Sequence, residues 1–200
     1  MRETQSIKAA RIILVSLAVL TLWAVFVTLG YLATIALHLP QSLGFPLSIR
    51  SIGLLAVLSS SLLFGWLIKY RKPVDILNST YVTFSKMMMK ARLEERAGRT
   101  EPLVVSGPYR YVRHPLYSAV VLLAFGLWLL LDYSALLVTT ILFLLWFNFV
   151  VAPFEERELR AIFGQDYEQY ANRVPKIIPI RRPVVQATRK AQNENIRKRT

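Results

Sequence analysis

The residues best suited to chemistry lie in the segment SGPYRYVRHPLY, which runs from Ser106 to Tyr117 and directly precedes an apolar stretch. Two adjacent acids, Glu155 and Glu156, follow after an apolar hairpin of fewer than forty residues. Because two membrane-length segments separate the basic and acidic clusters, both return to the same side of a bilayer. Polar side chains that gather at membrane depth usually have a functional role. We therefore expect a site for a charged or polar ligand at a membrane surface.

The sequence around His114 predicts the entrance of a helix. Pro115 suits the first turn of the helix that follows. Free backbone N–H groups and the helix dipole at such an entrance favour an anionic or polar ligand group. Tyr109 and Tyr111, taken alone, are equally typical of side chains that anchor a protein at headgroup depth. The combination of R-H-P-x-Y with the paired acids favours a ligand site.

The acids also have a simpler interpretation. Glu158 and one of the pair suit the first turn of a surface helix, EERELRAIF, with Pro153 ahead of it. This does not explain why an acid directly follows an apolar span and faces the basic cluster. Farther along, Pro175 and Pro179 prevent a helix and predict an extended strap.

The elements that must position these clusters are long apolar blocks. Residues 12–37 run for 26 residues and residues 51–68 for 18 without a formal charge. Leu116 to Leu131 and Ser134 to Val151 form two more blocks. About 20 apolar residues cross a hydrocarbon core of about 30 Å. We predict an all-α, polytopic transmembrane helical bundle with four spans, the N-terminal one retained and not a signal peptide. The block from Leu116 is short, so it spans with help from Tyr117, tilts, or is partly re-entrant.

The distribution of positive charge predicts the orientation. Three Lys or Arg residues lie in residues 1–11, ten in residues 69–113 and eleven after Val151. Arg50 is the one positive residue left for the other face, so 24 of the 25 basic residues lie on a single side. We therefore expect a multi-pass membrane protein with both termini and the central loop in the cytoplasm.

Composition excludes several function classes. The net charge of +13 is explained by this topology and by attraction to anionic lipids at the basic face, which leaves no need for a nucleic-acid partner. There is no cysteine, so disulfides, thiolate catalysis and cysteine-ligated metals are excluded. The two histidines are predicted on opposite faces, so we expect no metal site. No G-x-G-x-x-G or P-loop pattern occurs, which argues against a Rossmann nucleotide site.

The central connector predicts an amphipathic helix. Phe84, Met87, Met88 and Ala91 recur at helical spacing, so residues 75–97 hold a fifth helix that spans, leans into or lies on the membrane. We predict one membrane domain over residues 1–180, with its catalytic motifs in residues 101–179. Residues 181–200 are predicted to form a basic flexible tail.

These motifs carry a resemblance to a known family. GPYRYVRHPLY and EERELRAIFGQDYEQYANRVPKIIP, in this order and spacing, resemble the C-terminal half of the isoprenylcysteine carboxyl methyltransferases and related phospholipid methyltransferases. The resemblance covers roughly Leu103 to Pro179. It implies an integral-membrane methyltransferase that uses S-adenosyl-L-methionine without a Rossmann fold. In that family the cofactor pocket opens to the cytosol, and the lipid substrate enters from the bilayer.

The resemblance also implies which residues bind the cofactor. Carried over to this chain, the cofactor would be surrounded by Pro102, Leu103, Val104, Tyr109, His114, Pro115, Leu116, Tyr117 and Glu155. Glu155 would accept hydrogen bonds from the ammonium or ribose hydroxyls of the cofactor. A tyrosine face would favour the sulfonium by a cation–π term of about 0.5–2 kcal/mol.

The methyl acceptor is expected to be the α-carboxylate of a prenylated cysteine, which is already ionised and needs no general base. If the acceptor is instead the amine of a phospholipid, Glu156 becomes the candidate base. Eukaryotic carboxyl methyltransferases of the family carry an arginine shortly before the paired acids, but here that stretch reads FNFVVAPF. Arg173 is the preferred anchor for the substrate carboxylate, with Arg110 and Arg113 as alternatives.

Two other function classes stay open. Membrane sterol reductases share a related R-H-x-x-Y ending and bind NADPH, although this chain lacks an evident cluster for the 2′-phosphate. A non-catalytic membrane scaffold could also keep the motif for packing. Binding of S-adenosylmethionine or of NADPH separates these possibilities.

Overall fold

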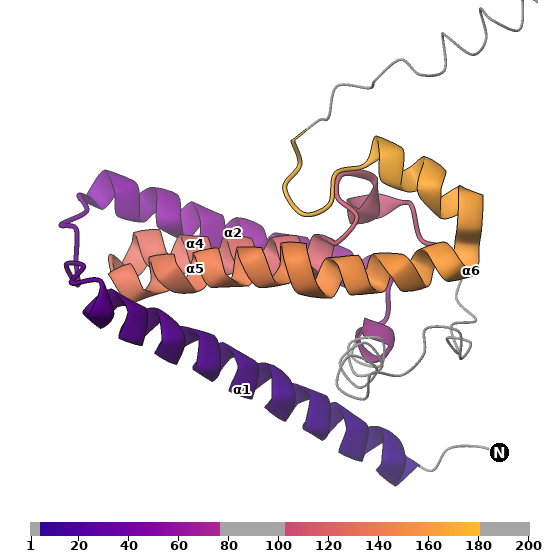
Figure 1. Ribbon diagram of the computed structural model, residues 1–200, viewed down its shortest axis with the longest axis horizontal. Coiled ribbons are helices and arrows are strands. Elements are labelled where there is room, and N and C mark those ends of the chain that lie inside the picture. Colours follow the sequence, from indigo (N-terminus) through magenta and orange to yellow (C-terminus); the bar gives the residue numbers. More distant parts are fainter. Residues whose placement is uncertain (1–4, 77–102, 181–200) are drawn as a thin grey trace, which may run out of the picture.

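The computed structural model describes residues 5–76 and 103–180. Within these two ranges the chain is helical with connecting loops and has no strand, which confirms the predicted all-α fold (Figure 1). The order is α1 (Gln5–Ala36), α2 (Leu47–Tyr70), η1 (Gly107–Arg110), α4 (Pro115–Leu131), α5 (Ser134–Trp146), η2 (Phe147–Val151) and α6 (Ala152–Arg173). Residues 77–97 of the predicted amphipathic helix, Pro102 and the C-terminal tail lie outside the described residues.

Three of these helical stretches are long and apolar enough to cross a membrane. They are Ser16–Ala36, Leu47–Tyr70 and Ser134–Arg173, counted over the described ranges. Helix α4 is apolar but shorter, with 17 residues. At 1.5 Å per residue its length is about 25 Å, less than a full hydrocarbon core. Three spans are therefore supported by length and composition, and the fourth stays a prediction.

Helices α2, α4 and α5 lie side by side (Figure 1). Helix α1 contacts α5 near the C-terminal end of α1, and its N-terminal part lies away from the bundle. Small residues let α2 and α4 approach closely. A Cβ added at Gly53 would lie 2.5 Å from the backbone nitrogen of Leu130. Ser60 Oγ also donates to the carbonyl of Ala119 at 2.8 Å. The Gly53 contact holds the end of α4 against α2, and the Ser60 bond holds the first turns of α4, which follow His114.

The chain from α5 to α6 continues without a break through the π-helical segment η2. The sequence alone also allows a separate surface helix that begins at the acids with Pro153 ahead of it, but Pro153 lies in the first turn of α6, directly after η2. Proline lacks an N–H and crowds the preceding turn, and a π-helical segment widens the backbone there. The acids thus extend from the same continuous helix that forms the third long span.

Gly164 then reverses the chain. Its φ of 50° and ψ of −122° are non-helical, and glycine adopts them without a Cβ clash. The end of α6 therefore folds back toward the segment that precedes α4 (Figure 1). After Arg173 the chain continues as the non-helical strap predicted from its prolines, here residues 174–180.

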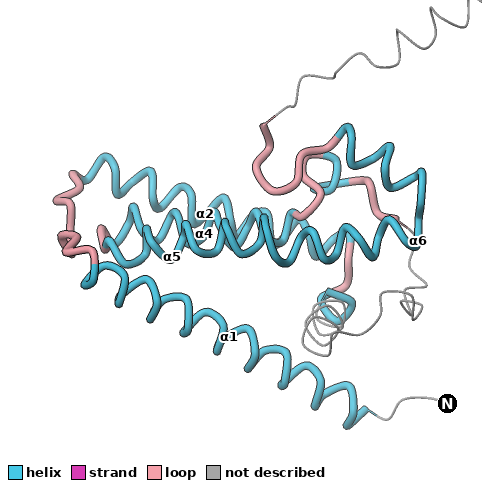
Figure 2. The backbone as a smooth tube through the Cα atoms, viewed as in Figure 1, coloured by secondary structure: helices cyan, strands magenta, loops and turns pink. Residues whose placement is uncertain are grey.

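Loops gather at the two ends of the bundle (Figure 2). At one end, the loop between α1 and α2 wraps Asp132, which caps α4 in the left-handed conformation. At the other end, η1, the strap and the folded-back part of α6 surround the start of α4 (Figure 2). The sequence motifs lie at this second end.

Candidate functional site

A pocket lies at the end of the bundle where α4 begins. It has a volume of about 830 Å³, counted with its opening to solvent. Eight of the nine residues predicted to surround a cofactor line it: Leu103, Val104, Tyr109, His114, Pro115, Leu116, Tyr117 and Glu155. Pro102 falls outside the described residues. The structure thus brings together the residues selected from the sequence, while their role in cofactor binding stays a prediction.

Other residues of the pocket wall are not among those predicted from the sequence. Leu67 and Arg71, at the end of α2, and Ile76 line one side of the pocket. Leu159 and Phe163 follow Glu155 at intervals of four residues, so the three share a face of α6. That spacing is visible in the sequence and could have identified this face. Tyr167 and Tyr170 reach the pocket only because the chain reverses at Gly164.

His114 is held between the two acids. It precedes α4 as the N-cap residue, as predicted, and its side chain is buried. Its Nδ1 lies 3.2 Å from Glu155 Oε2, and its Nε2 lies 3.3 Å from Glu156 Oε1. Burial alone would lower the pKa of His114, but hydrogen bonds and charge from Glu155 and Glu156 outweigh it and raise the pKa above 6.5. The imidazolium form, with a proton on each nitrogen, satisfies both carboxylates.

Glu156 is the centre of a buried charge cluster. Arg113 Nη2 lies 3.2 Å from Glu156 Oε1, and both side chains are buried. Arg160, which is more exposed, places Nη2 3.5 Å from Glu156 Oε2. We call Arg113, His114, Glu155 and Glu156 the charge cluster. With His114 protonated the cluster has no net charge, so its members satisfy one another in a partly desolvated site.

The strap holds the charge cluster through its backbone. The N–H of Arg113 donates to the carbonyl of Pro175 at 2.9 Å, and the N–H of His114 donates to that of Lys176 at 3.0 Å. Ser118 Oγ donates to the carbonyl of Ile177 at 2.5 Å. These bonds use N–H groups that a helix entrance otherwise leaves unpaired. Side chains of the motif are therefore positioned by main-chain contacts.

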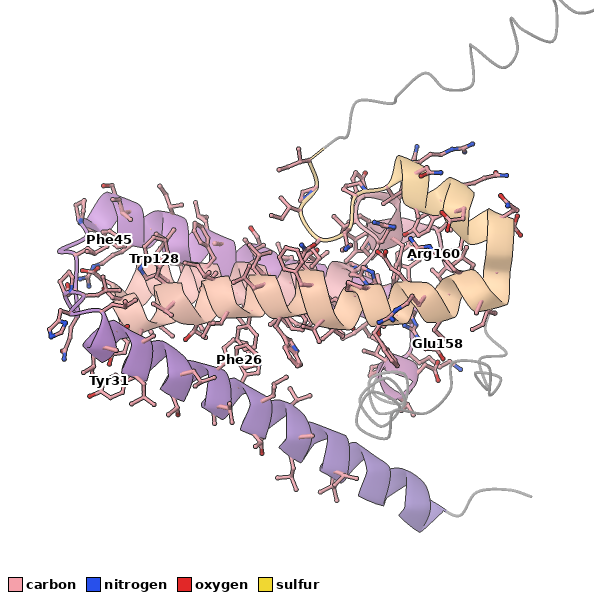
Figure 3. All side chains as sticks on the ribbon, viewed as in Figure 1. Phe26, Tyr31, Phe45, Trp128, Glu158 and Arg160 are labelled. Atoms are coloured by element: carbon pink, nitrogen blue, oxygen red, sulfur yellow. The ribbon has the colours of Figure 1, made fainter. Side chains whose placement is uncertain are left out.

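A row of stacked rings leads from the pocket into the bundle. His114 stacks on Tyr117 with ring centroids 5.3 Å apart, and Tyr117 stacks on Phe147 at 4.5 Å. Phe147 continues to Phe143 at 5.7 Å, and Phe143 stacks on Phe26 of α1 at 4.7 Å. Figure 3 shows Phe26 directed from α1 toward α5. The stack fixes the imidazole plane and ties η2 to the pocket wall.

Two buried polar atoms beside the pocket have no hydrogen-bond partner among the described residues. They are Arg113 Nε and the hydroxyl of Tyr167. Both residues line the pocket. Buried polar groups are normally paired, so these two atoms are suited to a ligand with acceptor groups. Together with the acidic side chain of Glu155, they fit a zwitterionic ligand such as an amino acid moiety.

The remaining predicted residues are placed differently. Arg110 and Arg173 are exposed and do not line the pocket. Glu156 contacts the pocket-lining residues Arg113 and His114 but is not itself part of the wall. The assignment of Glu158 to a solvated helix face is wrong, because its side chain is only 3% exposed. Glu156 and Glu158 lie on opposite sides of α6 because they are two residues apart, and both are buried, so this helix buries more than one face.

Comparison with known proteins identifies the region that carries the site. Residues 97–166 match the model of the phospholipid methyltransferase family. The family resemblance is confirmed for this region. The match includes most of the pocket-lining residues and the whole charge cluster. No solved structure matches the chain.

Individual relatives agree with this family. Protein-S-isoprenylcysteine O-methyltransferase B of Arabidopsis thaliana is 28% identical over 107 residues, which cover 52% of this chain and 53% of the relative. Protein-S-isoprenylcysteine O-methyltransferase of Schizosaccharomyces pombe is 39% identical over 80 residues, 39% of this chain and 33% of the relative. Methanethiol S-methyltransferase 1 of Bradyrhizobium diazoefficiens is 40% identical over 79 residues, 38% of this chain and 26% of the relative. The matches thus span about half the length of the first relative and less of the others.

Proposed function

We propose that the protein is a membrane methyltransferase that uses S-adenosyl-L-methionine and acts on a lipid-like acceptor. The observation that carries this proposal is the single pocket wall formed by eight motif residues inside the region similar to the phospholipid methyltransferase family. The preferred acceptor is the α-carboxylate of a prenylated cysteine. The names of the isoprenylcysteine O-methyltransferases among the relatives support this choice.

The side chains that line the pocket fit the chemistry of the proposed cofactor. Glu155 would bind the cofactor's ammonium group or its ribose hydroxyls, and His114 would hold Glu155 in place. Arg113 Nε and the Tyr167 hydroxyl are suited to acceptor atoms such as carboxylate oxygens. The ring of Tyr117, fixed between His114 and Phe147, would face a positive sulfonium.

Methyl transfer requires the protein mainly to align the two reactants and to exclude water from them. When bound, S-adenosylmethionine supplies a methyl group on sulfur: the acceptor oxygen forms the new C–O bond as the C–S bond breaks, and S-adenosylhomocysteine is released. A carboxylate acceptor is ionised at neutral pH, since an α-carboxyl titrates near about 3.5. No side chain then has to remove a proton, and alignment of the reactants supplies most of the rate.

The geometry favours this acceptor over a phospholipid amine. An amine must lose a proton, and Glu156 is the candidate base from the sequence. Glu156 is only 4% exposed and is engaged by Arg113, His114 and Arg160. A carboxylate held by three cations is a poor base, because each cation favours its ionised form. We therefore keep phospholipid N-methylation as the alternative.

The deciding experiment is a titration of the purified protein in detergent with S-adenosylmethionine and, separately, with NADPH. Calorimetry should detect binding of S-adenosylmethionine and no binding of NADPH. Methyl incorporation is then measured with a prenylated cysteine, phosphatidylethanolamine and a small thiol, and we expect the prenylated cysteine to be methylated fastest. Binding of NADPH instead would support a reductase, and binding of neither ligand would support a scaffold.

We also propose that the pocket faces the cytoplasm, with both termini on that side. The motive is the asymmetry of 24 basic residues against one. The loop that holds Gln41 lies at the end of the bundle opposite the pocket (Figure 2). Reporter fusions at Gln41 and at the C-terminus should therefore report opposite sides of the membrane. A result that places both on one side would contradict the proposed topology.

A further inference from the structure

Lys176 occupies an unusual place in the strap. Its carbonyl accepts the N–H of His114 at 3.0 Å, which puts its backbone directly against a residue of the pocket wall. The side-chain Nζ of Lys176 donates to the carbonyl of Asn148 at 3.2 Å. Asn148 belongs to the π-helical segment η2, seven residues before Glu155. Lys176 therefore connects the strap, the start of α4 and η2.

Lys176 has no carboxylate within ion-pair distance among the described residues. Its charge acts on Glu156 from farther away, and Glu156 is already engaged by Arg113, His114 and Arg160. The other partly buried cations at this end are neutralised at short range: Arg113 by Glu156, and His114 by both acids. Lys176 is half-buried, and its bond to Asn148 is to a neutral carbonyl. An ammonium group has three N–H donors. A half-buried cation with one neutral partner is suited to bind an anion, because a counter-charge offsets its desolvation.

The surface near Lys176 combines this cation with exposed apolar side chains. Phe149, the residue after Asn148, is 69% exposed, and Val150 is also exposed. On the strap, Ile178 and Ile180 are exposed as well. A cation beside apolar side chains at the end of a membrane span matches a molecule with an anionic head and an apolar tail.

We propose that Lys176 binds the anionic end group of a membrane-borne amphiphile and thereby positions the methyl acceptor at the pocket. This inference rests on the proposed methyltransferase function and names a residue for the acceptor side of that site. Arg173, the anchor chosen from the sequence, is exposed at the end of α6, whereas Lys176 is tied by its own backbone to His114. The charge of Lys176 also acts on Glu156, which contacts the pocket-lining residues Arg113 and His114, so an anion on Lys176 would lie beside the charge cluster.

Lys176→Gln tests the charge, because glutamine keeps an N–H donor for the Asn148 carbonyl and removes the cation. We expect the KM for a prenylated cysteine with a free carboxylate to rise about tenfold, as for the loss of one charge-assisted hydrogen bond. The kcat and the affinity for S-adenosylmethionine should change by less than about twofold. Lys176→Arg should restore most of the KM, since it restores the charge.

Lys72→Gln is the matched control. Lys72 is exposed near the end of α2 and does not line the pocket, so its replacement should leave KM and kcat unchanged. The comparison is valid only if both variants have the same melting temperature as the wild-type protein. If Lys176→Gln lowers the melting temperature, Lys176→Arg at full stability carries the test: a wild-type KM supports the proposal, and a raised KM overturns it.

A second measurement separates the acceptor from bulk lipid. Binding of wild-type protein and Lys176→Gln is compared on nanodiscs of phosphatidylcholine with and without phosphatidylserine. An unchanged KM with lost dependence on phosphatidylserine would overturn the proposal, because Lys176 would then bind headgroups alone. Loss of S-adenosylmethionine binding in Lys176→Gln would also overturn it and would place Lys176 among the supports of the cofactor pocket. Failure of the wild-type protein to bind S-adenosylmethionine would instead contradict the proposed function.

Discussion

Two buried carboxylates lie at opposite ends of the helical bundle and are satisfied in different ways. Asp132 accepts hydrogen bonds from the backbone N–H groups of Leu43 and Phe45, both at 2.9 Å, and from Ser42 Oγ at 2.6 Å. All three donors come from the single loop between α1 and α2, and the exposed Arg50 of α2 adds a longer ionic contact at 3.7 Å. Glu156 instead receives the side chains of Arg113, His114 and Arg160 from two elements of the fold.

The difference separates a structural cap from the proposed functional site. Backbone donors have a fixed charge and a fixed place, so the Asp132 site ties a loop to the end of α4. Side-chain cations can change protonation or partner, and those around Glu156 stand beside a pocket. Perturbed ionisable groups in a cleft are typical of functional sites, whereas a cap closed by backbone amides is typical of fold stability.

The largest effect is expected for Glu156→Ala. This change leaves Arg113 and His114 buried without their shared counter-charge, and breaking a buried ion pair typically costs about 3–5 kcal/mol of stability. The thermal midpoint should fall strongly, and methyl transfer should be lost. Glu168→Ala is the control, because Glu168 is largely exposed and pairs with Arg160 at the surface. Similar midpoints for the two variants would contradict the central place of Glu156.

Asp132→Ala should lower the thermal midpoint without changing the affinity for S-adenosylmethionine. The N–H groups of Leu43 and Phe45 and the hydroxyl of Ser42 would lose their acceptor. Asp132→Asn should be milder, since asparagine keeps a carbonyl acceptor and tolerates the left-handed conformation seen here, with φ at 53°. A loss of cofactor binding in either variant would remove the distinction between the two ends.

A smaller effect, on binding alone, is expected for Glu155→Ala. It removes an acceptor from the pocket wall, and we expect a loss of about 1–3 kcal/mol in the binding of S-adenosylmethionine. His114→Ala should lose a similar amount, because His114 fixes Glu155. Asp166→Ala is the control, since Asp166 is exposed on α6 away from the pocket wall. Glu158, being buried, is unsuited to that purpose. Equal titrations for Glu155→Ala and Asp166→Ala would remove Glu155 from the site.

The two ends should also respond to opposite changes of pH. The pKa of His114 is raised in the folded protein, so its contribution is complete below about 6.5 and is lost as pH rises through the raised value. Hydrogen bonds from Ser42 and from backbone N–H groups lower the pKa of Asp132 to about 2, so its contribution is present above 3.8 and is lost as pH falls toward 2. Cofactor affinity of the wild-type protein should decline on the alkaline side, and His114→Gln should flatten that decline. An unchanged profile in His114→Gln would show that another group titrates.

The sequence was sufficient for the features that depend on local order. Pro115 begins α4 and His114 precedes it, as expected, because the preference of proline for the first turn of a helix depends only on neighbouring residues. The apolar blocks form helices as predicted, because their length and composition can also be read from neighbouring residues. Most of the pocket wall could be selected because the motif residues are close in sequence on each side of one hairpin.

The features that depend on long-range folding could not be read in this way. The burial of Glu158 follows from a helix with neighbours on more than one side, which its own pattern does not indicate. Tyr167 joins the pocket because Gly164 reverses the chain, and a single glycine in a helical pattern does not reveal the direction of a turn. The sequence did not indicate where the side chain of Lys176 lies, because its partner Asn148 is 28 residues away on another element.

The strap also determines when the site can exist during protein synthesis. The N–H groups of Arg113 and His114 donate to the carbonyls of Pro175 and Lys176. These carbonyls leave the ribosome only after α4, α5 and α6 have been synthesised, so the two bonds cannot form earlier. Domains are synthesised from the N-terminus, so the helices enter the membrane before their charged end is closed. A nascent chain halted before residue 175 should therefore hold its helices but have no completed pocket, so the proposed activity should appear only once the strap has been synthesised and has folded back.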